Sequence, residues 1–245
     1  MLLQRAIIFR GKRLPQNHVF QCTFPIEELN FNFKIAQEDY RINAVHIKAQ
    51  QPKGLVFFLH GTLQHIQYHL PKATFFIENN YDVVMIDYPT YGKSKGKLIE
   101  ANLYAIVSHS FDSLMELIKP TGNIILYGRS LGTAMASYLA TLRKSDKLIL
   151  VSPYYSMPDL FNSKLPLFPF KKLKFKFENH THLQTVDCDT YIFHGTHDKL
   201  IPIQLSQKLI PYLKKEAHFI PIKNANHFNV HEQEEYKQAL KDLLS

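Results

Sequence analysis

The sequence predicts an α/β protein in which a mostly parallel central sheet is flanked by helices. Short apolar runs typical of buried strands recur along the chain, and most of them are separated by segments long enough for a helix. A chain of 245 residues, with 45% apolar and 20% charged residues, is large enough to form one such globular domain. We therefore predict a single domain over residues 1–245, with a small lid inserted over residues 152–183.

The expected elements begin with an antiparallel pair of strands and continue as a parallel series. Alternating polar and apolar residues predict the pair at Leu29–Ile35 and Ala44–Ala49. Continuous apolar runs predict the parallel strands, which are Leu55–Leu59, Val83–Ile86, Ile124–Tyr127, Leu148–Val151, Tyr191–Phe193 and His218–Ile222. Helices are expected between or after these strands, at Leu70–Asn79, Ile99–Lys119, Ser130–Lys144, Ile203–Leu213 and His231–Leu244.

The segment 152–183 interrupts this regular alternation. It contains four prolines and seven aromatic residues, and it follows a strand, so we expect it to lie over the carboxyl edge of the sheet. Sites of open α/β sheets form at that edge. Tyr155 and Phe161 are the predicted substrate contacts, while a packed surface loop without a substrate role is the alternative.

The net charge of +8 raises the question of an anionic partner. The basic residues are spread along the chain except for one short cluster at 171–176, and no nucleic-acid-binding module surrounds it. We expect no nucleic-acid partner. A solvated basic face is the simplest interpretation of the cluster, and weak peripheral contact with an anionic membrane is the alternative.

Neither a secretory signal nor a membrane span is recognisable in the sequence. The first ten residues hold only a short apolar stretch, which Gln4 and Arg5 interrupt, and no apolar run reaches about 18 residues. Cys22 and Cys188 match no metal-binding or redox spacing, so we expect two reduced thiols. These features predict a cytoplasmic protein.

The pentapeptide Gly128-Arg129-Ser130-Leu131-Gly132 has the form of a nucleophile elbow. It follows the apolar strand Ile124–Tyr127 and leads directly into a helix-forming segment. A sharp turn from strand to helix holds a serine hydroxyl exposed to a base and to backbone donors, as attack on a carbonyl requires. A simple helix N-cap is the alternative role for Ser130, but a cap does not require a glycine on both sides.

A serine nucleophile needs a histidine and an acid, and Asp198 and His227 are the predicted partners. Each follows a predicted strand, so the two side chains and Ser130 come to the same edge of a parallel sheet. Asp187 and Asp189 are alternatives for the acid, although both precede their strand. The alternatives for the base include the nearby His231, which is one of the other twelve histidines.

Two backbone N–H groups are expected to form the oxyanion hole. One belongs to Leu131, the residue after the nucleophile, and the other belongs to Thr62, in the loop after the strand Leu55–Leu59. A zinc site is the competing interpretation of two incomplete sets of ligands, which are His65 with His69 and His194 with His197 and Asp198. The sequence predicts no metal and no cofactor, because neither set is complete.

Several segments together resemble a known family. They resemble the successive motifs of the BEM46-like branch of the α/β-hydrolases. The α/β-hydrolase domain-containing proteins 13 and 17 are similar to that branch. The likeness runs from about Arg5 to the C-terminus. The segments are Phe58–Gly61, Met85–Tyr88, Tyr91–Gly96, Leu126–Gly132, Ser152–Ser156, Phe193–Asp198 and Ala225–Asn229. At Pro89–Gly92 the chain departs from the Arg-Gly-Tyr-Gly that relatives commonly carry.

This resemblance implies an α/β-hydrolase fold, a Ser130–Asp198–His227 triad and an esterase, thioesterase or related acyl-hydrolase activity. The expected reaction is cleavage of a small-molecule ester or thioester through an acyl-enzyme. A serine peptidase or aminopeptidase acting on short peptides is the enzymatic alternative. A non-catalytic binding protein that keeps the fold is the alternative from another class.

Overall fold

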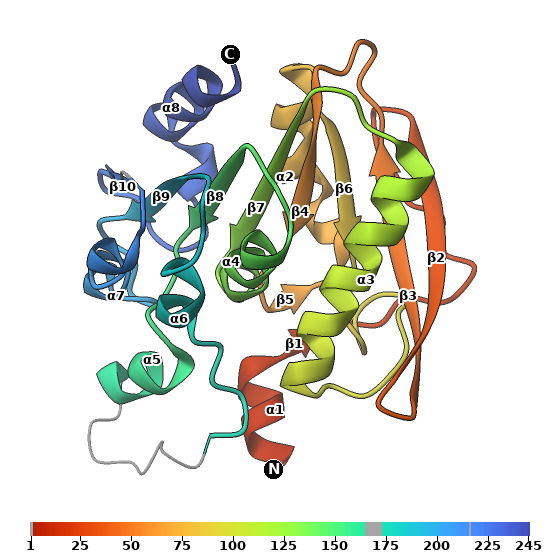
Figure 1. The fold of residues 1–245 in the computed structure, drawn as a ribbon, viewed down its shortest axis with the longest axis horizontal. Helices are drawn as coiled ribbons and strands as arrows, with labels where there is room; N and C mark the ends of the chain where they lie inside the picture. Colours follow the sequence, from red (N-terminus) through yellow and green to blue (C-terminus); the bar gives the residue numbers. More distant parts are fainter. Residues whose placement is uncertain (1, 165–172, 216) are drawn as a thin grey trace. The chain divides into compact units, whose positions relative to one another are not determined.

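The computed structural model describes residues 2–164, 173–215 and 217–245 (Figure 1). The chain separates into two compact units, Met1–Ile125 and Leu126–Ser245. From residue 54 onward strands alternate with helices, as the sequence predicts, apart from a short additional strand at Leu63–Gln64. The grouping of residues 1–245 into one domain stays a prediction. Among the described helices, none has the length and apolar character needed to cross a bilayer.

Four strands lie side by side in the first unit. Their order is β4 (Gly54–Leu59), β6 (Asp82–Ile86), β3 (Glu38–Ile47) and β2 (Ile26–Ile35). The β4–β6 pair is parallel, and the β6–β3 and β3–β2 pairs are antiparallel. Helices α2 (Ile66–Glu78) and α3 (Glu100–Ile118) lie on opposite faces of these strands (Figure 1). All residues of β4 and β6 are buried, as their continuous apolar sequences predict.

The antiparallel pair is confirmed, but its second strand begins six residues earlier than expected, at Glu38 rather than Ala44. Ile35 pairs with Glu38, so only Ala36 and Gln37 form the turn. Both have positive φ angles, 47° and 65°, as a two-residue hairpin turn of type I′ requires. Neither residue is typical of that turn, so the sequence contained no signal for the tight hairpin.

The first unit also contains short elements that were not predicted. Helix α1 (Leu2–Ile8) is followed by β1 (Arg10–Gly11), which pairs in parallel with β5 (Leu63–Gln64). The Arg10 N–H donates a hydrogen bond of 3.0 Å to the Thr62 carbonyl. The N-terminal segment therefore supports the loop that follows β4.

The second unit contains the strands that carry the predicted site. β7 (Asn123–Arg129), which starts in the first unit, is followed in sheet order by β8 (Lys147–Val151), β9 (Asp189–Gly195) and β10 (Ala217–Ile222). The β8–β9 and β9–β10 pairs are parallel. Helix α4 (Gly132–Leu142) contacts β8, and α7 (Ile203–Gln207) contacts β9.

All three helices predicted for this unit are shorter than expected, and α4 covers only Gly132–Leu142 of the predicted Ser130–Lys144. The segment predicted as one helix over Ile203–Leu213 contains α7 and a separate 3-10 turn, Ile210–Tyr212. Pro211 lies in that turn, where it has no N–H to continue an α-helix. The last helix, α8, spans Glu234–Leu244, and a 3-10 turn at Val230–Glu232 precedes it.

The predicted lid contains α5 (Met157–Lys164) and α6 (Asn179–Leu183). Between them, Leu173, Phe175 and Phe177 are buried while Lys174 and Lys176 are exposed. This alternation places the aromatic residues in the core and the lysines on the surface. Residues 165–172, which include Lys171 and Lys172 of the basic cluster, lie outside the described residues. Coverage of a site by this segment stays a prediction.

Candidate active site

Ser130 occupies the turn between β7 and α4. Its φ angle is +51°, a left-handed conformation that costs a non-glycine residue roughly 1–2 kcal/mol. The neighbouring structure holds it there, since the Ser130 N–H donates to the Val151 carbonyl of β8 at 2.9 Å. A strained serine between a strand and a helix is the geometry of a nucleophile elbow.

The glycine that begins this motif is required by close packing. A Cβ atom at Gly128 would lie 2.7 Å from the Gly132 carbonyl oxygen and 2.8 Å from the Ala136 Cβ. Both distances are shorter than a normal van der Waals contact, and both neighbouring atoms belong to the first turns of α4. The absence of a side chain at Gly128 therefore allows the helix to start directly behind the strand.

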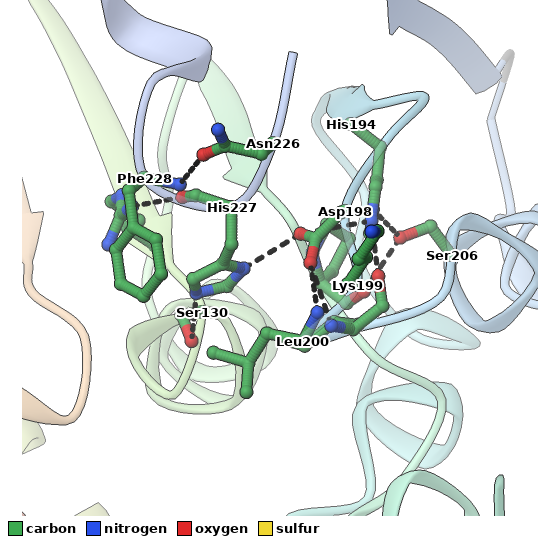
Figure 2. Close-up of polar contacts among 12 residues, drawn as sticks. Ser130, His194, Asp198, Lys199, Leu200, Ser206, Asn226, His227 and Phe228 are labelled. Atoms are coloured by element: carbon green, nitrogen blue, oxygen red, sulfur yellow. Dashed lines mark hydrogen bonds and ion pairs between the residues drawn. The ribbon is translucent and has the colours of Figure 1, made fainter. Parts of the chain in front are cut away.

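The side chains of Ser130, His227 and Asp198 form a hydrogen-bonded chain (Figure 2). The His227 Nε2 atom lies 3.2 Å from Ser130 Oγ, and its Nδ1 atom lies 2.7 Å from Asp198 Oδ2. The three residues are 5%, 4% and 6% exposed, respectively. The structure thus brings together the three residues that the sequence selected, in the order that general-base activation of a serine requires.

The acid is held by its own loop. Asp198 Oδ1 accepts hydrogen bonds from the N–H groups of Leu200 and Ile201 at 2.9 and 2.8 Å, which leaves Oδ2 to face His227. Burial raises the pKa of Asp198, but hydrogen bonds from His194 and His227 outweigh burial and bring the pKa below its ordinary range. Asp198 is therefore a carboxylate at neutral pH.

The surroundings of His227 favour a neutral imidazole. Because Nδ1 faces a carboxylate, that nitrogen carries the proton and Nε2 is left to accept from Ser130. Burial lowers the pKa of His227, and the nearby Asp198 carboxylate opposes part of this effect. The guanidinium of Arg129 donates to the His227 carbonyl and fixes the backbone of the loop.

The alternative acids lie elsewhere. Asp187 is exposed and forms an ion pair with Lys214 at 2.5 Å, and Asp189 is the first residue of β9, at the opposite end of that strand from Asp198. His194 faces Asp198, and His197 is exposed. In the described part of the chain, no group of three or more His, Cys, Asp or Glu side chains is arranged to hold a metal ion.

The two expected oxyanion donors belong to different units. Leu131 is the N-cap of α4, where backbone N–H groups lack partners within the helix. Thr62 lies in the first unit, where its carbonyl accepts hydrogen bonds from the Tyr91 hydroxyl and the Arg10 N–H. The His60 Nδ1 atom donates to the Gly61 carbonyl at 2.8 Å, which fixes the peptide that carries the Thr62 N–H. The joint action of Thr62 and Leu131 stays a prediction.

The predicted substrate contacts are half-buried. Tyr155 stacks on His180 with ring centroids 4.1 Å apart, and its hydroxyl donates to that of Tyr212 at 2.8 Å. Phe161 lies on α5. The contacts of Tyr155 are of the kind that hold a loop in place, and the role of both residues in substrate binding stays a prediction.

Two exposed apolar side chains next to the triad were not predicted. Leu200 is 45% exposed, and Phe228 is 51% exposed with its ring edge-on to His227 at 5.4 Å (Figure 2). They belong to the loops that carry the acid and the base. The signal was present in the sequence, because each is an apolar residue within two positions of a predicted catalytic residue.

A fully buried asparagine connects the segment predicted as a lid to the turn at Ser130. The Asn179 amide donates to the Tyr154 carbonyl at 2.9 Å and to Thr133 Oγ1 at 3.3 Å, and its oxygen accepts from Ser137. The Thr133 hydroxyl in turn donates to the Ser130 carbonyl at 2.6 Å. Helix α6 is thereby joined to the strained residue of the elbow, and no feature of the sequence identified this role.

Comparison with known proteins agrees with the fold. An esterase from Pyrococcus furiosus is similar over 96% of this chain and 98% of its own, with a TM-score of 0.73 and 17% identity. This likeness confirms the predicted α/β-hydrolase fold, with its mostly parallel sheet flanked by helices. Residues 50–184, more than half of the chain, match the family described as serine aminopeptidase, S33. The chain therefore belongs to this family of hydrolases.

Two curated relatives place the chain more closely. The human alpha/beta hydrolase domain-containing protein 17B is 29% identical over 171 residues, which are 68% of this chain and 57% of that protein. The Caenorhabditis elegans alpha/beta hydrolase domain-containing protein aho-3 is 29% identical over 67% of this chain and 49% of its own. The chain thus spans about half the length of these relatives. The resemblance to the branch that contains protein 17 is confirmed.

The separation of Asp198 from Asp187 leads to a first prediction. Replacing Asp198 with Asn preserves the shape but removes the charge that orients His227, so kcat for any substrate should fall roughly a thousand- to ten-thousandfold. Asp187→Asn, which removes only an exposed ion pair, should leave kcat within about twofold of the parent value. Steady-state kinetics of both variants measure this difference. If Asp187→Asn lowered kcat strongly and Asp198→Asn did not, the prediction that Asp198 is the acid would be wrong.

Proposed function

We propose that this hydrolase cleaves carboxylic esters or thioesters of small molecules through an acyl-enzyme. The observation that carries the proposal is the hydrogen-bonded chain from Ser130 through His227 to Asp198, with Ser130 held in the left-handed conformation of an elbow. His227 Nε2 accepts the hydroxyl proton as Ser130 Oγ attacks the carbonyl carbon. Asp198 keeps the imidazole in the required tautomer and stabilises the imidazolium.

The remaining steps follow from proton balance. The imidazolium of His227 returns its proton to the leaving alcohol or thiol, and the acyl group stays on Ser130. Water then attacks the acyl carbon, with His227 as the base, and the carboxylic acid leaves as Ser130 recovers its proton. We propose that the Leu131 and Thr62 N–H groups hold the oxyanion in both steps, where one such donor is typically worth roughly a hundred- to a thousandfold in rate.

The apolar side chains beside the triad support an acyl substrate. Leu200 and Phe228 would leave water on binding an alkyl chain, which stabilises the complex in proportion to the apolar area buried. The exposed Lys174 and Lys176 support an anionic remainder of the substrate or weak contact with an anionic membrane. No observation on the described residues favours nucleic acid as a partner.

A serine aminopeptidase is the second candidate, because the matching family carries that description. An acyl-enzyme mechanism serves both reactions, and the two differ in the leaving group and in the need to bind a free amino group. A panel of p-nitrophenyl esters, acyl-CoA thioesters and aminoacyl p-nitroanilides separates them. Higher kcat/KM for the aminoacyl anilides than for all esters would favour the peptidase.

A test of the nucleophile distinguishes the enzyme from a non-catalytic binding protein. A fluorophosphonate probe should label the parent protein and should not label Ser130→Ala, because only an activated hydroxyl reacts. The same substitution should lower ester hydrolysis to background while changing the melting temperature little. Ser137→Ala, which removes another buried hydroxyl of the same helix region, should still be labelled. Equal labelling of the parent and Ser130→Ala would remove Ser130 from the mechanism.

The exposed apolar residues make a prediction about chain length. Phe228→Ala and Leu200→Ala should lower kcat/KM more for longer acyl chains, because each methylene in an apolar contact is worth about 1 kcal/mol or more. A series of p-nitrophenyl esters from acetate to octanoate measures the trend. Leu142→Ala is the matched control, since Leu142 is also 45% exposed but lies at the end of α4 away from the elbow. A loss that is equal at every chain length would contradict the contact.

The lowered pKa of His227 sets the pH dependence. The base works only when neutral, and its burial favours the neutral form, so kcat/KM should rise with pH through a midpoint below about 6.5, the ordinary value for histidine. Full activity is then expected at neutral pH, with loss on acidification. A pH profile on a substrate without titrating groups gives the midpoint. A midpoint clearly above 7 would contradict this prediction, because the Asp198 carboxylate would then raise the pKa of His227 by more than burial lowers it.

A further inference from the structure

His194 is a second imidazole on the same carboxylate, and the mechanism above does not use it. It lies at the end of β9, and its side chain is fully buried. The Nε2 atom lies 3.4 Å from Asp198 Oδ2, the oxygen that also faces His227 (Figure 2). Asp198 is thus placed between two histidines, one on the side of the nucleophile and one on the side of the core.

The hydrogen-bond partners of His194 determine how many protons its ring carries. Nε2 lies 2.9 Å from the Ile201 carbonyl and near Asp198, and both of these groups can only accept, so Nε2 carries a hydrogen. Nδ1 lies 2.5 Å from the hydroxyl oxygen of Ser206. That hydroxyl lies 2.6 Å from the Pro153 carbonyl, which also can only accept.

Ser206 has one hydroxyl hydrogen, and it satisfies either Pro153 or His194. If the hydrogen goes to the Pro153 carbonyl, the Ser206 oxygen accepts from His194 and Nδ1 carries a hydrogen as well. Both ring nitrogens then donate. In the competing arrangement Ser206 donates its hydrogen to Nδ1 of His194. The Pro153 carbonyl, 2.6 Å from the Ser206 oxygen, then loses that hydrogen bond, and leaving a buried acceptor unsatisfied costs roughly 1–3 kcal/mol.

We propose that His194 is an imidazolium in the folded protein and acts as a positioning residue for the acid, as the inner member of a His194–Asp198–His227 array. A buried cation is unfavourable alone, but here it pairs with a buried carboxylate, so the resting array has no net charge. The ring donates to Ser206 on α7 and to the Ile201 carbonyl of the loop that carries Asp198, and the Ser206 hydroxyl in turn donates to the Pro153 carbonyl after β8, so the hydrogen bonds join three segments.

The charge on His194 has a consequence for His227. A cation behind the carboxylate weakens the attraction between Asp198 and a protonated His227, and it repels that proton directly, so His227 stays neutral to lower pH. Within the described ranges, the other groups that face His227 are the Ser130 hydroxyl, the ring of Phe228 and Arg129, whose guanidinium donates to the His227 carbonyl. Arg129 is unchanged in the test below, so its effect is constant.

Spectroscopy of the whole protein tests the protonation state directly. Protein labelled with ¹⁵N-histidine gives long-range ¹H–¹⁵N spectra that distinguish an imidazolium from either neutral tautomer. The resonances of His194 are those that disappear in His194→Gln. We expect two protonated nitrogens at His194 at pH 7.5 and a neutral ring at His227. A neutral His194 at that pH would overturn the proposal, whether or not the protein hydrolyses esters.

Kinetics tests the effect on the base, and this part rests on the proposed function. His194→Gln keeps a neutral donor for the Ile201 carbonyl but removes the charge, so the acid limb of kcat/KM should move upward by roughly 0.5–1 on the pH scale. The alkaline plateau should stay within about threefold of the parent. His197→Gln, which changes an exposed histidine of the same loop, should leave the limb in place. If His194→Gln lowered the alkaline plateau of kcat/KM but left the midpoint of the acid limb in place, the role of His194 would be structural and the proposal would be wrong.

Ser206→Ala provides a second variant if His194→Gln does not fold. It removes the acceptor of the Nδ1 hydrogen without changing the volume of the core appreciably, and it should move the acid limb in the same direction. If Ser206 instead donates to His194, the limb stays where it is and the proposal fails. Fluorophosphonate labelling of the parent keeps the two hypotheses distinguishable, because an unlabelled parent rejects the catalytic role while the ¹⁵N spectra still decide the charge on His194.

Discussion

The buried carboxylate of Asp198 is the group on which the rest of the candidate site depends. Two backbone N–H groups of its own loop fix one oxygen, and the second oxygen is thereby directed at His227. That contact selects the tautomer of His227, and the tautomer in turn leaves Nε2 opposite Ser130. A buried ion that lost one of these partners would be left uncompensated, which typically costs about 3–5 kcal/mol. Catalytic geometry and local stability therefore depend on the same few hydrogen bonds.

Backbone strain is the second constraint, and it appears where strands end. Ser130 follows β7 and Ser152 follows β8, and both have a φ angle of +51°. Each is held by a hydrogen bond from its N–H to the next strand, to Val151 and to Phe193, respectively. The parallel strands thus supply acceptors that over-determine these conformations, which explains how non-glycine residues remain in the left-handed region. Backbone hydrogen bonds therefore fix the conformation of the sheet edge at Ser130 and Ser152.

The sequence was sufficient for the parts of the structure that follow from local chemistry. Ser130, Asp198 and His227, which the structure brings together, could be selected as candidates because each follows a strand, and continuous apolar runs identify buried strands well. The hairpin at Ala36 and Gln37 could not be found, because neither residue is typical of its turn. The network of Asn179 joins residues 42 and 46 positions apart, and such long-range contacts leave no periodic signal in the sequence.

The surroundings of His194 in the structure differ from what its spacing in the sequence indicates. The family match ends at residue 184 and does not reach Asp198 and His227, which the structure connects to Ser130 by hydrogen bonds. In the sequence, His194 is only a polar residue at the end of an apolar strand, and its spacing to Asp198 suggested metal ligands. In the structure its two nitrogens face a carbonyl, a hydroxyl and the acid. The charge proposed for His194 depends on the groups that surround both ring nitrogens at once, and the spacing of residues in the sequence does not specify those groups.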